Sequence, residues 1–320
     1  MRFNKWQIRV IAIIICYVLP IAILLGEWSL KCNGYLRLIM DIDIGILIYL
    51  FYRCNTWELS CVFYRDIYVL IYVIITIFQV VTGNYDTKFS ESDKWIGIFA
   101  IVESVLLLYV FYTVRKAMKK PKQCMQLDFP YQNGKFLITD AGDGAHSAFV
   151  NYHYKSVVHG AHNIQNSMRY AVDIVKINRL GRSAKTILRK NKEDYASFGE
   201  TIYCPLDGEV VNVVDGIQDN EPFPGMKNLK YNIGNRVVVK NKEYYLILGH
   251  FKNGSVRVKK GDAIKRGDVL GCSGCSGLSP RPEIHMQLVK SDTGEYWMGE
   301  GVPFVFEDDR YPVKNMVFKR

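Results

Sequence analysis

The chain of 320 residues is long enough for about two domains, and its apolar residues are spread unevenly along it. Residues 1–122 contain long apolar runs, whereas residues 123–320 have the composition of an ordinary soluble domain. The net charge of +10 is shared evenly between the two parts, and neither part clusters its basic residues as a nucleic-acid binder does. The composition predicts a membrane region followed by a soluble domain, with the lipid bilayer and no nucleic acid among its partners.

Four apolar stretches within residues 1–120 predict an α-helical membrane region with four helices, at about residues 10–25, 35–52, 67–82 and 95–114. The first stretch follows basic residues and has no small-residue cleavage site after it, which indicates a signal anchor and not a removable signal peptide. Asp41 and Asp43 interrupt the second stretch. Carboxylates inside a membrane are often functional, but these two could equally lie near the membrane surface, and the sequence leaves both readings open.

A basic cluster directly follows the last apolar stretch and consists of Arg115, Lys116, Lys119, Lys120 and Lys122. Basic residues beside membrane helices mark the cytoplasmic side. With four crossings, the cluster places both the N-terminus and the soluble domain in the cytoplasm. If the second stretch does not cross, the domain faces outward. We therefore expect a multi-pass protein of the cell membrane, and the charge pattern favours a cytoplasmic domain.

Residues 121–133 are expected to form a linker, and from residue 134 to residue 320 the pattern changes to β-structure. Short runs of alternating apolar and polar residues end in Gly, Asn or Asp, which is typical of strands joined by tight turns. Residues 199–216 and 235–251 are expected to form hairpins, and the polar run 182–196 a short helix or a loop. Because strands and helices do not alternate, we expect a mostly antiparallel β domain, with the architecture of a β-sandwich.

Two short strands carry the residues that suggest a site. In the strand from Glu283 to Leu288 successive side chains point to opposite faces, so Glu283, His285 and Gln287 share one face. Asp173 lies in a second strand among apolar neighbours, where a carboxylate is costly unless it is paired or binds a metal. All six histidines of the chain lie between residues 146 and 285. These features together favour a metal site in the β domain.

Three motifs carry a resemblance to a known family: RYAVDIVKI at residues 169–177, YYLILGHFKNGSVRVKKGDAIKRGDVLGCSG at residues 244–274, and PEIHMQL at residues 282–288. From about residue 134 to residue 288 the chain resembles the lysostaphin-type zinc metallopeptidases, hydrolases that cleave peptide cross-links of the peptidoglycan in bacterial cell walls. The resemblance implies a lysostaphin-like fold, zinc as the cofactor, and a peptide or peptidoglycan substrate. Carried over position by position, it makes Asp173 and His285 zinc ligands and His250 a catalytic residue.

Two positions depart from the family pattern. Arg169 stands where the family has its first histidine ligand, and Glu283 stands where it has the first histidine of a His-x-His strand. Some relatives with an Arg-Tyr-Ala-x-Asp strand carry a histidine in an Asn-Tyr-His strand instead. The resemblance therefore makes His153 the expected third zinc ligand, with His162 as the alternative. Glu283 either acts as a general base or marks a loss of activity.

These departures leave two principal functions open. The first is a membrane-anchored zinc endopeptidase that acts on peptidoglycan peptides. The second is a catalytically degenerate peptidase-fold domain with a binding or regulatory role at the membrane, which a cytoplasmic location would favour because peptidoglycan lies on the other side. A transport or sensing role through Asp41, Asp43 and Glu103 is a third reading. The pair Cys272 and Cys275 lacks the second pair that a zinc site of its kind needs.

Overall fold

A computed structural model of the chain describes residues 34–82, 91–154, 166–186, 191–222 and 233–320, together with single positions between residues 11 and 26. The first predicted membrane helix, residues 10–25, therefore lies largely outside the described residues. His159 and His162 also lie outside the described residues. The remaining predicted helices and the whole sheet of the β domain can be compared with the structure.

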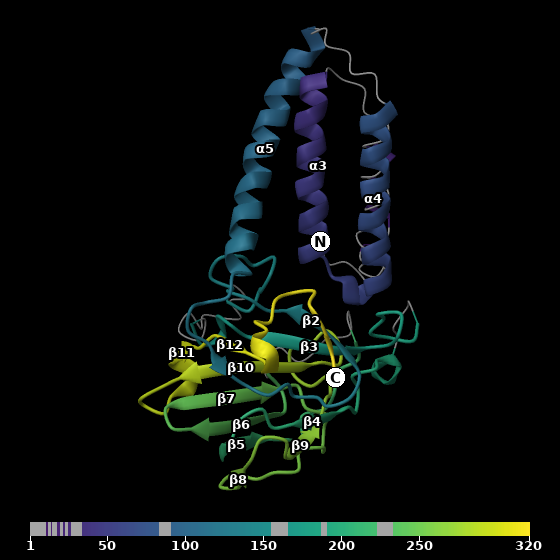
Figure 1. Ribbon diagram of the computed structural model, residues 1–320. Coiled ribbons are helices and arrows are strands. Elements are labelled where there is room, and N and C mark those ends of the chain that lie inside the picture. Colours follow the sequence, from purple (N-terminus) through teal and green to yellow (C-terminus); the bar gives the residue numbers. More distant parts are fainter. Residues whose placement is uncertain are drawn as a thin grey trace, which may run out of the picture.

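Three long helices form the N-terminal part that the structure describes: α3 (Gly34–Cys54), α4 (Val62–Thr82) and α5 (Glu91–Ala117). They stand side by side at one end of the β domain, with α3 between α4 and α5 (Figure 1). In the described part of the chain two helices, Val62–Thr82 and Lys94–Ala117, are long and apolar enough to cross a membrane. The predictions at residues 35–52, 67–82 and 95–114 thus fall on helices, each somewhat longer than predicted.

Both carboxylates of helix α3 have partners within the helical region. The Arg37 guanidinium lies 2.7 Å from the Asp41 carboxylate and also donates to the Gln79 side chain at 2.7 Å. The Ser104 hydroxyl donates to Asp43 at 2.5 Å. Arg37 thus joins α3 to α4 and Asp43 joins α3 to α5, whereas the Asp41 carboxylate pairs with Arg37 within α3.

Among the described residues, nine strands form one large sheet in which every neighbouring pair is antiparallel. The order across the sheet is β13 (Val317–Lys319), β2 (Lys135–Asp140), β3 (Val172–Ile177), β10 (Ile284–Lys290), β7 (Tyr244–Gly249), β6 (Arg236–Asn241), β5 (Gly208–Val214) and β8 (Ala263–Ile264), with β11 (Glu300–Gly301) paired to β10. Two small pairs lie apart from it: β1 (Met125–Gln126) with β12 (Phe304–Val305), and β4 (Thr201–Tyr203) with β9 (Val269–Cys272).

Short 3₁₀ turns complete the elements: η2 (Trp57–Leu59), η4 (Asn166–Met168), η5 (Lys192–Asp194), η6 (Tyr296–Met298) and η7 (Glu307–Asp309). The polar run at residues 182–196, predicted as a short helix or a loop, contains η5 within irregular structure where it is described.

The main hydrophobic core lies between one face of the large sheet and the two small strand pairs. Sheet residues such as Ile174, Val237 and Met286 pack there with Ile202 of β4 and Phe304 of β12. The prediction of a mostly antiparallel domain is confirmed. The predicted sandwich is corrected to one large sheet covered by two small pairs, because the strands that oppose it have only two to four residues each.

Two local predictions differ from the structure. Residues 121–133 are more than a linker, since they contain strand β1 and since the fully buried Leu127 belongs to the main core. Residues 199–216 do not form a hairpin, because β4 pairs with β9 and β5 pairs with β6 and β8. Pairing over long sequence distances overrides the turn signal there. The predicted hairpin at residues 235–251 is confirmed as β6 and β7.

The helical region docks closely against the β domain. The Val62 N–H donates to the Gly181 carbonyl at 3.1 Å, and the Asn315 amide donates to the Asn55 carbonyl at 2.9 Å. Gly181 has a φ of +78°, and a Cβ added there would lie 2.6 Å from the Val62 Cβ, so this position requires glycine for both its conformation and its space.

Candidate metal centre

The register of two central strands brings Asp173 and His285 together. Strands β3 and β10 are antiparallel neighbours, and His285 is the direct cross-strand partner of Asp173. Flanking residues of both strands, such as Ile174 and Met286, turn to the other face and enter the main core. The His285 Nδ1 atom lies 2.9 Å from the Asp173 carboxylate, and both side chains are buried. The strand period of two thus places this pair opposite the core face.

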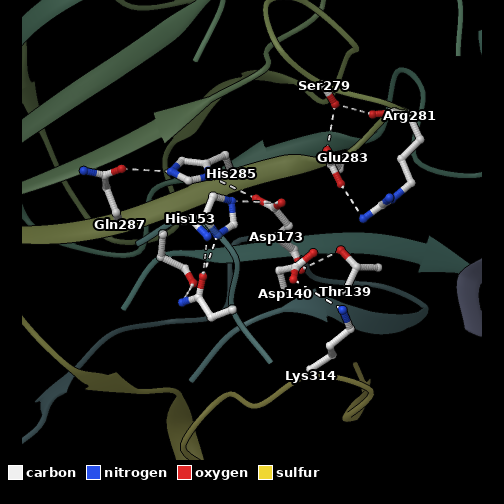
Figure 2. Close-up of polar contacts among 12 residues, drawn as sticks. Thr139, Asp140, His153, Asp173, Ser279, Arg281, Glu283, His285, Gln287 and Lys314 are labelled. Atoms are coloured by element: carbon white, nitrogen blue, oxygen red, sulfur yellow. Dashed lines mark hydrogen bonds and ion pairs between the residues drawn. The ribbon is translucent and has the colours of Figure 1, made fainter. Parts of the chain in front are cut away.

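His153 is the third member of the cluster. Its Nε2 atom lies 3.2 Å from the second Asp173 oxygen, and its ring lies edge-on to the His285 ring at 4.9 Å between centroids. The side chains of His153, Asp173 and His285 point toward one another (Figure 2). Each offers one ligand atom, and these atoms all lie within 4.8 Å of one another. Two imidazoles and one carboxylate are a ligand set that zinc uses.

Two amide side chains determine which ring nitrogens face this cluster. The Asn151 oxygen lies 2.8 Å from His153 Nδ1, and its amide nitrogen donates to the Gly142 and Ala171 carbonyls at 2.9 and 3.0 Å. With the amide nitrogen engaged in this way, the oxygen accepts the His153 Nδ1–H. The neutral ring then presents an unprotonated Nε2 to Asp173, as a metal ligand must.

Gln287 plays the same part for His285. Its side-chain oxygen lies 2.9 Å from His285 Nε2, and its amide nitrogen donates to the Ser167 carbonyl at 3.3 Å. The ring therefore carries its proton on Nε2 and turns Nδ1 toward Asp173. In the neutral state, two imidazole lone pairs and a carboxylate face one small buried space, an arrangement that a bound cation stabilises.

The charges buried around the cluster also favour a dication. In the described part of the chain they are four carboxylates and two basic side chains: Glu58, Asp140, Asp173, Glu283, Arg281 and Lys314. The acidic groups outnumber the basic ones even when Glu283 is protonated, so a bound cation is electrostatically favoured and the residues present fit a metal.

In the absence of a metal cation, protonation of the histidines supplies positive charge beside Asp173. Burial opposes the ionisation of Asp173, but the adjacent His153 and His285 hold the pKa of this carboxyl well below its ordinary value. Burial likewise disfavours the charged form of His153, but the Asp173 carboxylate raises the pKa of that imidazole. The carboxylate thus attracts positive charge into the cluster, which a metal ion satisfies in the same place.

His250 lies beside the cluster and has an unusual backbone. Its φ is +67°, in the left-handed region that residues other than glycine rarely adopt. Its ring is 5.9 Å from the His285 ring between centroids, and its Nδ1 lies 2.7 Å from the Ser276 carbonyl, to which it donates. Burial lowers the pKa of His250 to about 4, so at neutral pH the ring is neutral and Nε2 is a free acceptor. Strained backbone of this kind gathers at functional sites.

The two positions that depart from the family pattern are both engaged in ion pairs. Arg169 makes two parallel hydrogen bonds, of 2.8 and 2.7 Å, with the Asp143 carboxylate. Glu283 accepts a hydrogen bond from Ser279 at 2.8 Å and lies 3.1 Å from the Arg281 guanidinium (Figure 2). Burial raises the pKa of Glu283 to about 8, against the opposing effect of Arg281. Neither side chain makes a contact of this kind with the ligand cluster.

The structure therefore brings together four of the five predicted site residues, namely His153, Asp173, His250 and His285. The fifth, Glu283, lies on the adjoining segment with its carboxylate directed toward Ser279 and Arg281 (Figure 2). His162, the alternative ligand, lies outside the described residues. Sequence reasoning did not assign a role to the supporting amides of Asn151 and Gln287. Their spacing of two from a histidine was the signal that could have found them.

The CxxC pair has no partner in the described structure that would make it a metal site. Cys272 and Cys275 are both free thiols, and burial raises the pKa of Cys275, which disfavours the thiolate that binds metals.

Comparison with known families assigns a domain to the second half of the chain. The model of peptidase family M23 matches residues 193–296, which gives this stretch an M23 peptidase domain. The matched stretch contains His250, Glu283 and His285, whereas His153 and Asp173 precede it. No curated protein matches the chain.

Solved structures of peptidases are among the similar structures. A zinc-containing peptidase from Vibrio cholerae is 18% identical with a TM-score of 0.29, over 51% of this chain and 36% of that one. The catalytic domain of lysostaphin, an antimicrobial peptidase from Staphylococcus simulans, is 22% identical with a TM-score of 0.25, over 38% of this chain and 68% of that one. The chain thus spans about a third of the length of the V. cholerae peptidase.

Proposed function

We propose that the protein is a membrane-anchored zinc metallopeptidase of the lysostaphin type that hydrolyses peptide bonds in peptidoglycan peptides. The observation that carries this proposal is the cluster of His153, Asp173 and His285, whose inward-facing atoms suit a dication, beside the neutral His250. The M23 domain at residues 193–296 supports the class of reaction. The cluster supplies three ligands, and a catalytic zinc site keeps its fourth position open for water.

Each residue of the site has a proposed role. His153, Asp173 and His285 hold the metal, with Asn151 and Gln287 fixing the two rings. Zinc bound there would polarise the scissile carbonyl and lower the pKa of a water molecule toward neutrality. His250 accepts a proton through its free Nε2; because its Nδ1–H is donated to Ser276, the neutral ring has no second N–H with which to stabilise an oxyanion.

Glu283 bears on the rival proposal. A buried carboxyl with a pKa of about 8 can exchange a proton near neutral pH, which suits a general acid or base. However, its contacts with Ser279 and Arg281 direct it away from the ligands (Figure 2). The second candidate function is accordingly a degenerate peptidase domain that binds or regulates, and the ion pairs of Arg169 and Glu283 are the observations that favour it.

The zinc content of the purified full chain in detergent micelles tests the metal proposal. The wild type is expected to hold one zinc per chain, and Asp173→Ala and His153→Ala are expected to lose it. His146→Ala is the matched control, since His146 is a half-buried histidine that contacts Asp143 outside the cluster. Wild-type protein that is folded but free of zinc contradicts the peptidase and favours the degenerate domain.

Peptide cleavage then separates the two functions. Zinc-loaded wild type is expected to cleave cross-linked or glycine-rich peptides of the cell-wall type. If the protein binds zinc and leaves all of them intact, the peptidase proposal fails although the metal site stands.

The side of the membrane on which the β domain lies decides whether it meets peptidoglycan. The basic residues after helix α5 favour the cytoplasm, whereas the proposed substrate requires an extracytoplasmic domain. Labelling of a Lys260→Cys variant by a membrane-impermeant thiol reagent on intact cells tests this, because Lys260 is exposed on the domain. Labelling on intact cells supports the peptidase. Labelling only after lysis supports the regulatory domain. The parent chain, which retains its own cysteines, is the control.

A further inference from the structure

The turn between helices α3 and α4 is held by several contacts and touches the β domain through Ser183 and Arg281. Trp57 is fully buried, and its indole N–H donates to the Phe51 and Tyr52 carbonyls at 3.0 and 3.1 Å. The Ser183 hydroxyl of the β domain donates to the Glu58 carbonyl at 2.8 Å. Glu58 is only 1% exposed. A carboxylate in so fixed a turn has a defined position relative to the domain.

Glu58 is the first of three buried charged side chains in contact. One terminal nitrogen of Arg281 lies 3.3 Å from Glu58, and the other lies 3.1 Å from Glu283. Arg281 is 9% exposed and Glu283 is 1% exposed. Because the guanidinium binds a different carboxylate with each terminal nitrogen, its orientation is fixed only while both carboxylates are present.

Glu283 lies at the point where the chain enters the candidate site. It precedes His285 by two residues, and its N–H donates to the Gly274 carbonyl at 3.1 Å. The Gly274 N–H donates in turn to the His250 carbonyl at 2.9 Å. The segment from Ser279 to His285 therefore connects the helical turn with both histidines.

The other position that departs from the family pattern shows the same arrangement. Arg169 binds Asp143 with two hydrogen bonds, and the Asp143 N–H donates to the carbonyl of Ala117, the last residue of helix α5, at 2.8 Å. Arg169 is thus linked to the helical region through one ion pair and one backbone hydrogen bond, and Glu283 through two ion pairs. The ion pairs join the helices to the strands that carry Asp173 and His285.

We propose that Glu58 is a positioning residue of the candidate site: through Arg281 it holds Glu283 and the segment that carries His285 into strand β10. The helical region then contributes to the geometry of the site, and a movement of α3 against α4 is transmitted to it through Arg281. The effect on catalysis rests on the proposed function, whereas the positioning itself does not.

Hydrogen exchange of the full chain in detergent micelles, followed by mass spectrometry, tests the positioning directly. Glu58→Gln keeps the shape of the side chain and removes its charge. We expect amides in residues 279–285 to exchange about tenfold faster, because the buried ion pair that orients Arg281 is lost. The matched control is Ser183→Ala, which removes a hydrogen bond to the same Glu58 without touching Arg281 and should change exchange there less than about twofold.

A double variant shows whether Glu58 acts through Glu283. We expect Glu58→Gln combined with Glu283→Gln to exchange no faster at residues 279–285 than Glu283→Gln alone. Additive effects, wild-type exchange in Glu58→Gln, or an equal effect of Ser183→Ala each overturn the proposal. If Glu58→Gln does not fold, hydrogen exchange at residues 279–285 is measured in Arg281→Lys instead. The same acceleration is expected there, because an ammonium group cannot bridge both carboxylates as a guanidinium does.

Kinetic measurements distinguish a positioning role of Glu58 from a purely structural one. If the protein cleaves peptides, Glu58→Gln should lower kcat about tenfold and change KM less than about twofold, since misplaced groups act on the transition state. A wild type that cleaves nothing contradicts the proposed function alone, and the exchange measurement still decides the role of Glu58.

Discussion

At the scale of single residues, two amide side chains determine the orientation of two histidine rings. Asn151 and Gln287 each accept the outward N–H of an imidazole and turn the other ring nitrogen toward Asp173. Their own amide nitrogens are held by backbone carbonyls, so the oxygen cannot exchange places with the nitrogen without loss. The two rings are therefore oriented in the absence of a metal, which would lower the cost of binding one.

Gln287→Leu removes the acceptor for His285 Nε2–H and should weaken zinc binding about 10- to 100-fold, because outer partners of metal ligands contribute this much. Competition with a chelator of known affinity measures the effect on the full chain. Gln287→Glu, which keeps an acceptor at the same place, is the control and should retain most of the affinity. Equal zinc affinity in Gln287→Leu and wild type would show that the amide does not orient the ring.

His250→Ala should lower the rate of peptide cleavage at least about a hundredfold and leave the zinc content at one per chain, because the ring acts on the proton and not on the metal. Cleavage rate and metal content are measured on the same preparation. A loss of zinc in this variant would instead assign His250 to the ligands, and an unchanged rate would remove it from the chemistry.

Strand β10 is the element on which the site depends. It pairs with β3 on one side and with β7 on the other, so its backbone groups are bonded on both edges. Arg281 holds the segment that precedes β10, and Arg169 precedes its neighbour β3. The two ion pairs flank the two strands that supply Asp173 and His285, and each belongs to the connection between the sheet and the helices.

Acid should weaken the ion pair between Arg169 and Asp143 in a defined pH range. Burial opposes ionisation of Asp143, but the hydrogen bonds from Arg169 lower the pKa of this carboxyl below its ordinary value. A carboxyl with a lowered folded-state pKa contributes stability that is fully present above about pH 4 and is lost as the pH falls through the folded-state value.

Arg169→Met should therefore lower the free energy of unfolding by about 1 kcal/mol at pH 7, a small value because the arginine is partly exposed. The difference from wild type should shrink as the pH falls below about 4. Thermal unfolding at several pH values, with a chelator present, gives the comparison. Arg257→Met, at an exposed position, is the control, and a difference that does not depend on pH would exclude the ion pair as its cause.

At the scale of the whole molecule, the helices and the β domain share an interface of specific hydrogen bonds. Asn315 donates to carbonyls at the end of α3, and the Arg65 side chain of α4 donates to the Asn315 carbonyl at 2.8 Å. Gly181 fits against Val62. The helical region thus forms part of the packed structure of the β domain. Its removal would expose polar groups of the domain and the buried Arg281.

A truncated chain of residues 119–320 should unfold at a temperature several degrees below that of the full chain. Each lost kcal/mol lowers the midpoint by about 2–4 °C in a domain of this size, and several contacts are lost together. The midpoint of thermal unfolding is measured for both chains in the same detergent by circular dichroism, at a wavelength that reports on the β domain. An equal midpoint would mean that the interface adds no stability, and would also weaken the case for transmission through Arg281.

The sequence by itself determined the local features of this protein. Apolar length predicted the helices at residues 35–52, 67–82 and 95–114, and alternation with period two predicted the strands around Asp173 and His285 and the face each side chain takes. These properties depend on neighbours within a few residues. The resemblance then named His153, Asp173, His250 and His285 together, and their side chains lie together in the structure.

Only the tertiary structure decided the features that depend on distant residues. The pairing of β4 with β9, the burial of Leu127 and Phe129 in the main core, and the contact of His153 with Asp173 all require chain segments to meet that the sequence places apart. The same applies to the ion pairs of Arg169 with Asp143 and of Arg281 with Glu58, which no spacing rule predicts. Charge–charge contacts are set by the geometry of the whole fold, which is why the link from Glu58 to the site appeared only there.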